Sequence, residues 1–260
     1  MIVQNACDWI IERLERRTPF FATRINDGEM CQMYRTKPEG ALLGTDANPA
    51  YCHRELGEAL SRMLDEMGQT DMENELLDQI LIGCSWNTDR ADELGQTRFK
   101  DDVRGYNLLT ANWCHEHWPL EGVVDGNTIR LLEVISRTAP AMLVTCRGLM
   151  DARWCMKANG WEVPAEDSWS YRDKVLSSSL GPVYAKAGFT FVWCAGGGLK
   201  PTAWRLWREF PQSSHIDLGH LFNGAFGMTD YGWLQRQDGP WYQPYFKQGG
   251  LKDWVRGFLP

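Results

Sequence analysis

The sequence predicts an α/β protein in which helices cover both faces of a mainly parallel β-sheet. Three observations lead to this fold class. From about residue 128 onward, short apolar runs of strand length alternate with segments of helical period. Gly and Pro stand at the ends of several of these elements. The 260 residues, 43% hydrophobic and 23% charged, are enough to bury a full core, so we expect one domain over residues 1–260.

The first half of the chain begins with an amphipathic helix over 6–16, followed by the strand "PFFATRI" at 19–25. A second helix is indicated by apolar residues at helical spacing, namely Leu56, Leu60, Met63, Leu64 and Met67. The run "ILIGCS" at 80–85 is typical of a buried strand. Residues 86–127 are rich in Trp, Asn, Asp and Arg and show no clear period, so we interpret them as a lid or an acceptor-binding region.

The second half alternates regularly. We predict helices over 128–137, 149–160, 171–187 and 201–210, and strands over 141–146, 161–164, 189–195 and 214–219. Gly160 would close the second of these helices and Pro164 the second strand. Ligands in parallel sheets bind beyond the carboxyl ends of the strands, so the loops there are the ones to search. Beyond them, the aromatic segment 228–260 would cover the core, pack across a dimer or hold an acceptor; the oligomeric state stays open.

Composition narrows the class of protein. Eight cysteines occur without a CxxC pair, and several lie in apolar runs, which is typical of reduced core thiols. Cys114–His117, "CHEH", lacks the second pair of ligands that a structural zinc site needs.

The net charge of −7 gives no overall attraction to nucleic acid or to an anionic membrane, although it does not exclude a local basic groove. With no signal peptide and no membrane span in the pattern, we expect a cytoplasmic protein.

The loop "AGGGLKPTAW" at 195–204 favours an anion site. Gly196, Gly197 and Gly198 would let the backbone approach a ligand closely, and Lys200 and Thr202 lie at the start of a helix whose N–H groups attract phosphate. The spacing fits neither a Walker A loop nor GxGxxG. A tight strand-to-helix turn without a ligand explains the same glycines.

The stretch "RINDGE" ends the first predicted strand. In an extended chain Asp27 and Glu29 point to the same side, so both carboxylates could hold one hard cation such as Mg²⁺ or Mn²⁺. A plain Asp-Gly turn at Asp27 and Gly28 is the alternative.

Further candidates lie at other strand ends. Arg147 follows the strand at 141–146, and Asp217 and His220 end the last strand, where they could act as a base, a hydroxyl contact or an extra ligand. Among 13 tryptophans, Trp169 lies in a loop and is the best candidate for stacking on a ligand. For Trp154, Trp204 and Trp207, which fall within predicted helices, we expect core packing.

Several segments together resemble the GT-D type glycosyltransferases. "TPFFATRINDGEM" is similar to the family's strand that runs into Arg-x-Gly-Asp-Gly-Glu, with its Asp-x-Glu metal motif. "ILIGCS", "MLVTCRG", "WEVPAEDSWSYRDKVL", "FVWCAGGGLKPTAWRLW" and "HIDLGHLF" resemble later family segments in the same order. The resemblance covers residues 18 to 222.

This resemblance implies a Rossmann-like glycosyltransferase that uses a nucleotide-sugar donor, commonly a UDP-sugar, with Mn²⁺ or Mg²⁺. Asp27 and Glu29 take the metal-motif positions, and Arg24 takes the basic position before them. Asn26 replaces the usual Gly, and Cys84-Ser85 replaces the more usual Ile-Pro, which leaves the donor specificity open.

Two other classes remain open. A methyltransferase or dehydrogenase would carry its Gly-rich turn after the first strand, whereas here the glycines come late and the acids early. A non-catalytic module that binds a nucleotide sugar is the other. The acceptor would be a glycan, a protein or a modified nucleic-acid base, and the sequence does not decide among them.

Overall fold

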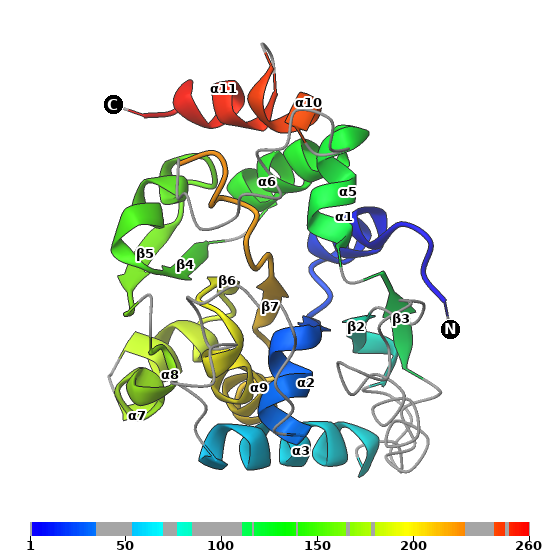
Figure 1. Cartoon of the computed structure of the whole chain (residues 1–260), viewed down its shortest axis with the longest axis vertical. Helices are drawn as coiled ribbons and strands as arrows, with labels where there is room; N and C mark the ends of the chain where they lie inside the picture. Colours follow the sequence, from blue (N-terminus) through cyan, green and yellow to red (C-terminus); the bar gives the residue numbers. More distant parts are fainter. Residues whose placement is uncertain are drawn as a thin grey trace.

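The computed structural model describes residues 2–34, 54–69, 77–84, 111–115, 117–138, 140–164, 167–177, 180–226, 242–247 and 250–259. Its centre is a sheet of seven parallel strands in the order β3-β2-β1-β7-β6-β4-β5 (Figure 1). The strands are β1 (Phe21–Ile25), β2 (Ile80–Cys84), β3 (Asn112–Cys114), β4 (Ala141–Thr145), β5 (Asn159–Glu162), β6 (Thr190–Cys194) and β7 (Ser214–Asp217). The predicted α/β class with a parallel sheet is confirmed.

Helices cover both faces of the sheet. One face carries α1 (Ala6–Arg16), α5 (Trp118–Val124) and α6 (Asn127–Thr138), and the other carries α2 (Asp27–Tyr34), α3 (Arg54–Gln69), α7 (Arg172–Ser177), α8 (Leu180–Lys186) and α9 (Lys200–Glu209). Short 3₁₀ helices complete these layers: η3 (Leu77–Gln79), η5 (Arg147–Trp154), η6 (Trp169–Tyr171) and η7 (Gly197–Leu199). Each layer encloses its own hydrophobic core.

The strands supply alternate side chains to these two cores because successive residues of a strand point to opposite faces. In β6, Phe191 and Trp193 belong to the same hydrophobic cluster as α3 and α9, whereas Val192 and Cys194 belong to the cluster of α1 and α6. Both faces of the strands are therefore apolar, as parallel sheets covered on two sides require. Arg24 is an exception, since it is a charged residue inside fully buried β1.

Helix α1 illustrates how capping residues and the spacing of apolar residues in the sequence determine a helix. Asn5 caps it by accepting a hydrogen bond from the backbone N–H of Asp8, and Arg17 ends it in the left-handed conformation. Its buried residues recur at helical spacing along one stripe, namely Ala6, Cys7, Ile10, Ile11 and Leu14.

Two predicted helices differ from the sequence-based expectation. The predicted helix 149–160 is the 3₁₀ helix η5, which ends at Trp154, and Lys157 then adopts a positive φ that a continuing helix would not allow. Gly160 consequently lies inside β5 and closes no helix. Over the predicted helix 171–187 the described residues form α7 and α8, and residues 178–179 lie outside the described part.

Part of the middle region, predicted as a lid or an acceptor-binding region, forms regular secondary structure. Within 86–127 the chain forms edge strand β3 and helix α5, so this part belongs to the sheet and its cover. Residues 85–110 lie outside the described residues.

The described part of the C-terminal segment packs on the core. It forms α10 (Tyr242–Phe246) and α11 (Leu251–Arg256), with α10 against α5 (Figure 1). Tyr245 is fully buried and donates a 2.8 Å hydrogen bond to the carbonyl of Leu221. These contacts favour the structural alternative for the segment, at least for the part described.

Two further expectations concern side chains and membranes. Six cysteines are buried free thiols, as predicted, while Cys31 and Cys52 lie outside the residues whose side chains are described. Among the described helices, none is both long and apolar enough to cross a bilayer.

Candidate functional site

The candidate site lies at the carboxyl edge of three adjacent strands, β1, β7 and β6. Their last residues are Ile25, Asp217 and Cys194. The loops that follow carry the acidic stretch, the "LGH" stretch and the Gly-rich turn, so the fold brings three separately predicted segments together. This edge is where parallel sheets bind ligands.

Glu29 reaches the site from the first turn of α2. The chain turns into helix directly after β1, and the backbone N–H of Asn26 donates a 3.0 Å hydrogen bond to Glu29 Oε2, which is half of a capping box. The premise that Asp27 and Glu29 lie in extended chain is therefore wrong, because residues two apart on a helix do not share a face. The side chain of Asp27 is outside the described part, so its role as a ligand stays a prediction.

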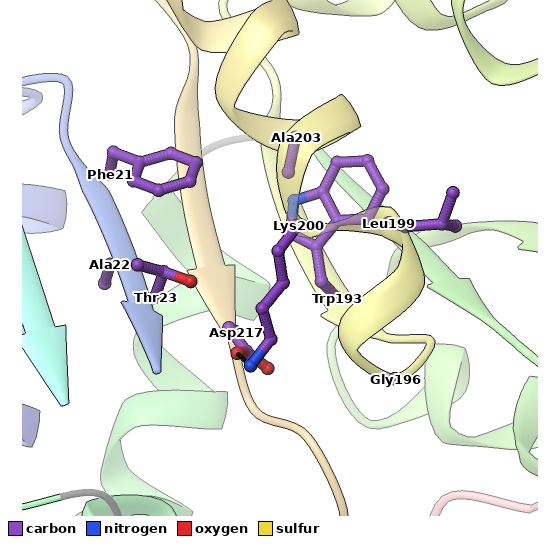
Figure 2. A pocket seen from close by; sticks show the side chains of 9 residues that line it. All are labelled: Phe21, Ala22, Thr23, Trp193, Gly196, Leu199, Lys200, Ala203 and Asp217. Carbon is purple, nitrogen blue, oxygen red and sulfur yellow. Dashed lines mark ion pairs between the residues drawn. The ribbon is translucent and has the colours of Figure 1, made fainter. Parts of the chain in front are cut away.

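Lys200 joins the acids of two strand ends. It is the first residue of α9, and its side chain runs beside Trp193 toward Asp217 at the end of β7 (Figure 2). Its ammonium nitrogen lies 2.7 Å from Glu29 Oε1 and 3.1 Å from Asp217 Oδ2, and it donates to the backbone carbonyl of Arg24. Three oxygen acceptors thus surround the three donors of one ammonium group.

Arg24 and the backbone of Gly219 also contact Asp217, in addition to Lys200. Arg24 Nε lies 3.6 Å from its Oδ2, and the backbone N–H of Gly219 donates a 2.9 Å hydrogen bond to its Oδ1. Gly219 has φ of 51°, and a Cβ there would overlap the guanidinium of Arg24. Only glycine therefore lets the chain turn under Arg24.

These four side chains place compensating charges in a buried region. Arg24, Glu29, Lys200 and Asp217 are each at most 7% exposed. Burial alone would raise the pKa of Asp217, but the positive charges of Lys200 and Arg24 outweigh it and hold that pKa below its ordinary value. Buried ion pairs contribute little net stability compared with apolar packing, so such a cluster at a strand end is a candidate for function.

The Gly-rich turn closes the cluster on one side. Gly196 precedes η7 with φ of 70°, and a Cβ on Gly197 would lie 2.5 Å from Glu29 Oε1. Gly198 packs against Ser168 and Trp169 just as closely.

The cavity enclosed between β1, β7 and α9 measures only about 10 Å³, room for about one water molecule. A larger ligand would therefore have to bind outside this cavity, over the turn and the strand ends.

Two histidines lie near Arg24. Burial, followed by the charge of Arg24, lowers the pKa of His220 to about 3 and that of His117 to about 4. Both rings are therefore neutral at pH 7. His220 is accordingly a poor general base, since an effective base has a pKa near the working pH. Its neutral ring still suits a hydrogen bond to a hydroxyl group.

Three predicted residues lie away from the cluster. Trp169 and Thr202 line a neighbouring open cavity of about 450 Å³ between α3, α7 and α9. Trp169 is buried, with the guanidinium of Arg172 4.4 Å from its ring centroid, so it does not present the open ring that stacking requires. Arg147 is exposed at the end of β4, and no ion pair within the described ranges joins it to the cluster.

Of the three tryptophans expected to pack in the core, Trp204 and Trp207 are buried as expected, whereas Trp154 is 43% exposed.

In the "CHEH" stretch, His115 contacts a carboxylate of α5. His115 Nδ1 lies 2.8 Å from Glu121 Oε1, and Cys114 is a buried thiol whose pKa is raised by burial to about 12. No group of three or more His, Cys, Asp and Glu side chains suited to a metal ion occurs among the described residues.

Sequence reasoning named the members of the cluster but missed how they pair. It placed Lys200 with the glycines and Glu29 with Asp27, whereas the fold pairs Lys200 with Glu29 and Asp217. It also missed Gly219, for which the signal was a glycine two residues after Asp217, the last residue of β7. Comparisons of the chain with protein-family models, with curated proteins and with solved structures find no match.

Proposed function

We propose that the protein is a glycosyltransferase that moves a sugar from a nucleotide-sugar donor, with a UDP-sugar the first candidate, to an acceptor. The observation that supports this best is the buried charge cluster of Arg24, Glu29, Lys200 and Asp217 beside the Gly-rich turn. Sugar transfer leaves a nucleoside diphosphate whose developing negative charge needs cations and N–H donors nearby. The resemblance to GT-D glycosyltransferases in the order of motifs points to the same chemistry.

Each part of the site has a role in this proposal. The backbone of Gly196 to Gly198 and the first turn of α9 provide N–H groups for the diphosphate, and Lys200 and Arg24 provide positive charge. Asp217 stays ionised and fixes both cations. His220, neutral at pH 7, is proposed to contact a hydroxyl of the sugar or the acceptor.

A divalent cation is part of the proposal, and the donor atoms suit one. Glu29 Oε1, Asp217 Oδ2 and the carbonyl of Arg24 are all oxygens, the ligand type that Mg²⁺ and Mn²⁺ prefer, and they already surround one cationic group. Glu29 and Asp217 are the proposed ligands within the described part of the chain, together with Asp27, which the resemblance implies as a ligand. When bound, the ion would neutralise charge on the leaving diphosphate.

A non-catalytic nucleotide-sugar binding module is the second candidate. The observation in its favour is that both carboxylate oxygens of Glu29 already have partners, namely Lys200 and the N–H of Asn26. The nature of the acceptor, whether glycan, protein or nucleic acid, and a cytoplasmic location stay predictions.

Hydrolysis of the donor separates these candidates, because it requires only the donor site and water. We expect slow release of UDP from at least one member of a panel of UDP-sugars with Mn²⁺, and loss of that release with EDTA or in Glu29→Gln. Glu133→Gln is the matched control, because Glu133 is an exposed acid on α6 at the opposite face of the sheet. Binding of a nucleotide sugar without any release, with or without acceptor candidates, would favour the binding module. Neither binding nor release with any nucleotide sugar would overturn both.

A further inference from the structure

The position of Lys200 has a consequence for metal binding. Its ammonium group is only 7% exposed and sits among three oxygens contributed by three different elements: α2, β7 and β1. An ammonium group and a hard metal ion make the same demand on such a site, which is a set of converging oxygens. Where one cation is seated, a second cannot take the same oxygens.

We propose that Lys200 is the resident cation of this site, and that a divalent ion binds Glu29 and Asp217 only by displacing it. The proposal rests on the proposed function for its biological meaning. It makes Lys200 a positioning residue whose ammonium would be released toward the neighbouring Gly-rich turn, where the diphosphate is expected. Lys200 lies directly after that turn in the chain. The proposed exchange is a change of its side-chain rotamers.

Charge balance supports an exchange over simple addition. In this structure the two cations, Arg24 and Lys200, compensate the two carboxylates, Glu29 and Asp217. Adding a divalent ion while Lys200 stays in place would leave the buried cluster with two excess positive charges, and unpaired charge in a buried region is costly. When the ammonium group leaves, the excess falls from two positive charges to one. Glu29 Oε1 then has no ammonium partner and can bind the metal ion.

The direction of the Lys200 side chain argues against a role in packing alone or in phosphate binding alone. A lysine that packs only through its aliphatic stem would extend its ammonium group to solvent, and a lysine that serves only phosphate would leave its ammonium unpaired with protein carboxylates. Instead its nitrogen points at Asp217 (Figure 2) and lies within ion-pair distance of two carboxylates. Glu29 is fixed independently by the N–H of Asn26, so its carboxylate stays in place when Lys200 leaves.

The test is Mn²⁺ binding without any nucleotide, measured by electron paramagnetic resonance of the free ion. We expect Lys200→Met to bind Mn²⁺ at least tenfold more tightly than the wild type, because the oxygens are then unoccupied and carry a net negative charge. Glu29→Gln in the Lys200→Met background should return the affinity to the wild-type level or below. Lys200→Arg keeps a cation in place and should bind Mn²⁺ no better than the wild type.

Lys186→Met is the control, since Lys186 is an exposed lysine at the end of α8, and it should leave Mn²⁺ binding unchanged. The thermal melting temperature gives a second measurement, and Mn²⁺ should raise it more for Lys200→Met than for the wild type. Equal or weaker Mn²⁺ binding by Lys200→Met would overturn the proposal, as would a variant that fails to fold even with Mn²⁺ present. Failure of the glycosyltransferase assignment would instead appear as absent donor hydrolysis, with the Mn²⁺ results unaffected.

Discussion

Strand β7 carries two buried polar side chains that the fold treats in different ways, His215 in its middle and Asp217 at its end. His215 is fully buried between aromatic rings, with Phe191 stacked at a centroid distance of 4.9 Å. Asp217 is almost as deeply buried but is surrounded by Lys200 and Arg24. Burial of a polar group therefore does not by itself identify a functional site.

The two sites differ in how their polar atoms are satisfied. Trp193 Nε1 can only donate, so Nδ1 of His215 accepts its 3.2 Å hydrogen bond, and Nε2 must carry the hydrogen. That nitrogen donates to Ser213 Oγ at 3.0 Å, and the hydroxyl donates to the carbonyl of Phe210. The neutral groups around His215 satisfy one another by hydrogen bonds and stabilise the fold. The end of the strand instead brings charged side chains together, and a ligand could contact these charges.

Asp217→Asn should have the largest effect on stability. It removes one of two negative charges that compensate Arg24 and Lys200, and loss of one partner from a buried ion cluster costs about 3 to 5 kcal/mol. Urea denaturation measures the change in the free energy of unfolding, and Asp151→Asn, at an exposed position in η5, is the control. A cost no greater than that of the control would mean that the cluster is not ionised as described.

His215→Phe should have a smaller effect. The ring still packs against Phe191, but the N–H of Trp193 and the hydroxyl of Ser213 lose a partner, which costs about 1 to 3 kcal/mol for an unsatisfied buried group. The same denaturation experiment measures it. An increase in stability would show that the neutral network is dispensable and would remove the contrast with Asp217.

The pH dependence of stability sharpens the comparison. Burial lowers the pKa of His215 from 6.5 to about 3, so between these values the unfolded chain takes up a proton that the folded chain does not. Stability is therefore present above pH 6.5 and falls as the pH decreases toward 3, with this residue contributing a slope of at most about 1.4 kcal/mol per pH unit.

The wild type and His215→Phe, compared from pH 7 to pH 4.5, isolate that contribution, since Asp217, His117 and His220 titrate in both. The wild type should lose stability more steeply. Identical slopes would mean that the histidine is protonated inside the fold, contrary to the network of neutral groups.

Gly197→Ala should have the smallest effect on stability and a clear effect on the site. Its new Cβ would lie 2.5 Å from Glu29 Oε1, and the carboxylate must shift by rotating its side chain. We expect a change in unfolding free energy below about 1 kcal/mol, together with a several-fold loss of UDP affinity, measured by calorimetry. Gly257→Ala is the matched control, since Gly257 is exposed, has φ of −63°, and a Cβ there comes no nearer than 3.3 Å to any atom beyond its chain neighbours. Unchanged UDP affinity in Gly197→Ala would place the ligand away from this turn.

Much of the fold was predictable because most strands are continuous apolar runs and most helices are strongly amphipathic. Strand β3 was not, since it spans three residues and begins with Asn112, whose buried amide is satisfied by the carbonyls of Asp78 and Ile80. No local pattern reveals such a long-range partner. The short helices around 147–187 were misjudged because η5 has a helical composition but ends early at the turn through Lys157.

The site was predictable as a set of residues but not as a set of pairs. Strand ends can be located from sequence, and parallel strands place their carboxyl ends at one edge, so Glu29, the Gly-rich turn and Asp217 were expected on the same side. The strand order was not readable, and it is this order, with β7 inserted between β1 and β6, that brings Lys200 to both acids.

The most direct test of the central claim compares the two buried sites in one titration. UDP with Mn²⁺ is titrated by calorimetry into the wild type, Glu29→Gln and His215→Phe, and repeated with EDTA. If the charge cluster at the strand ends binds the donor, Glu29→Gln and EDTA each weaken UDP binding at least tenfold, while His215→Phe leaves it within twofold of the wild type. Equal UDP affinity in all of these conditions, or a loss confined to His215→Phe, would contradict the account.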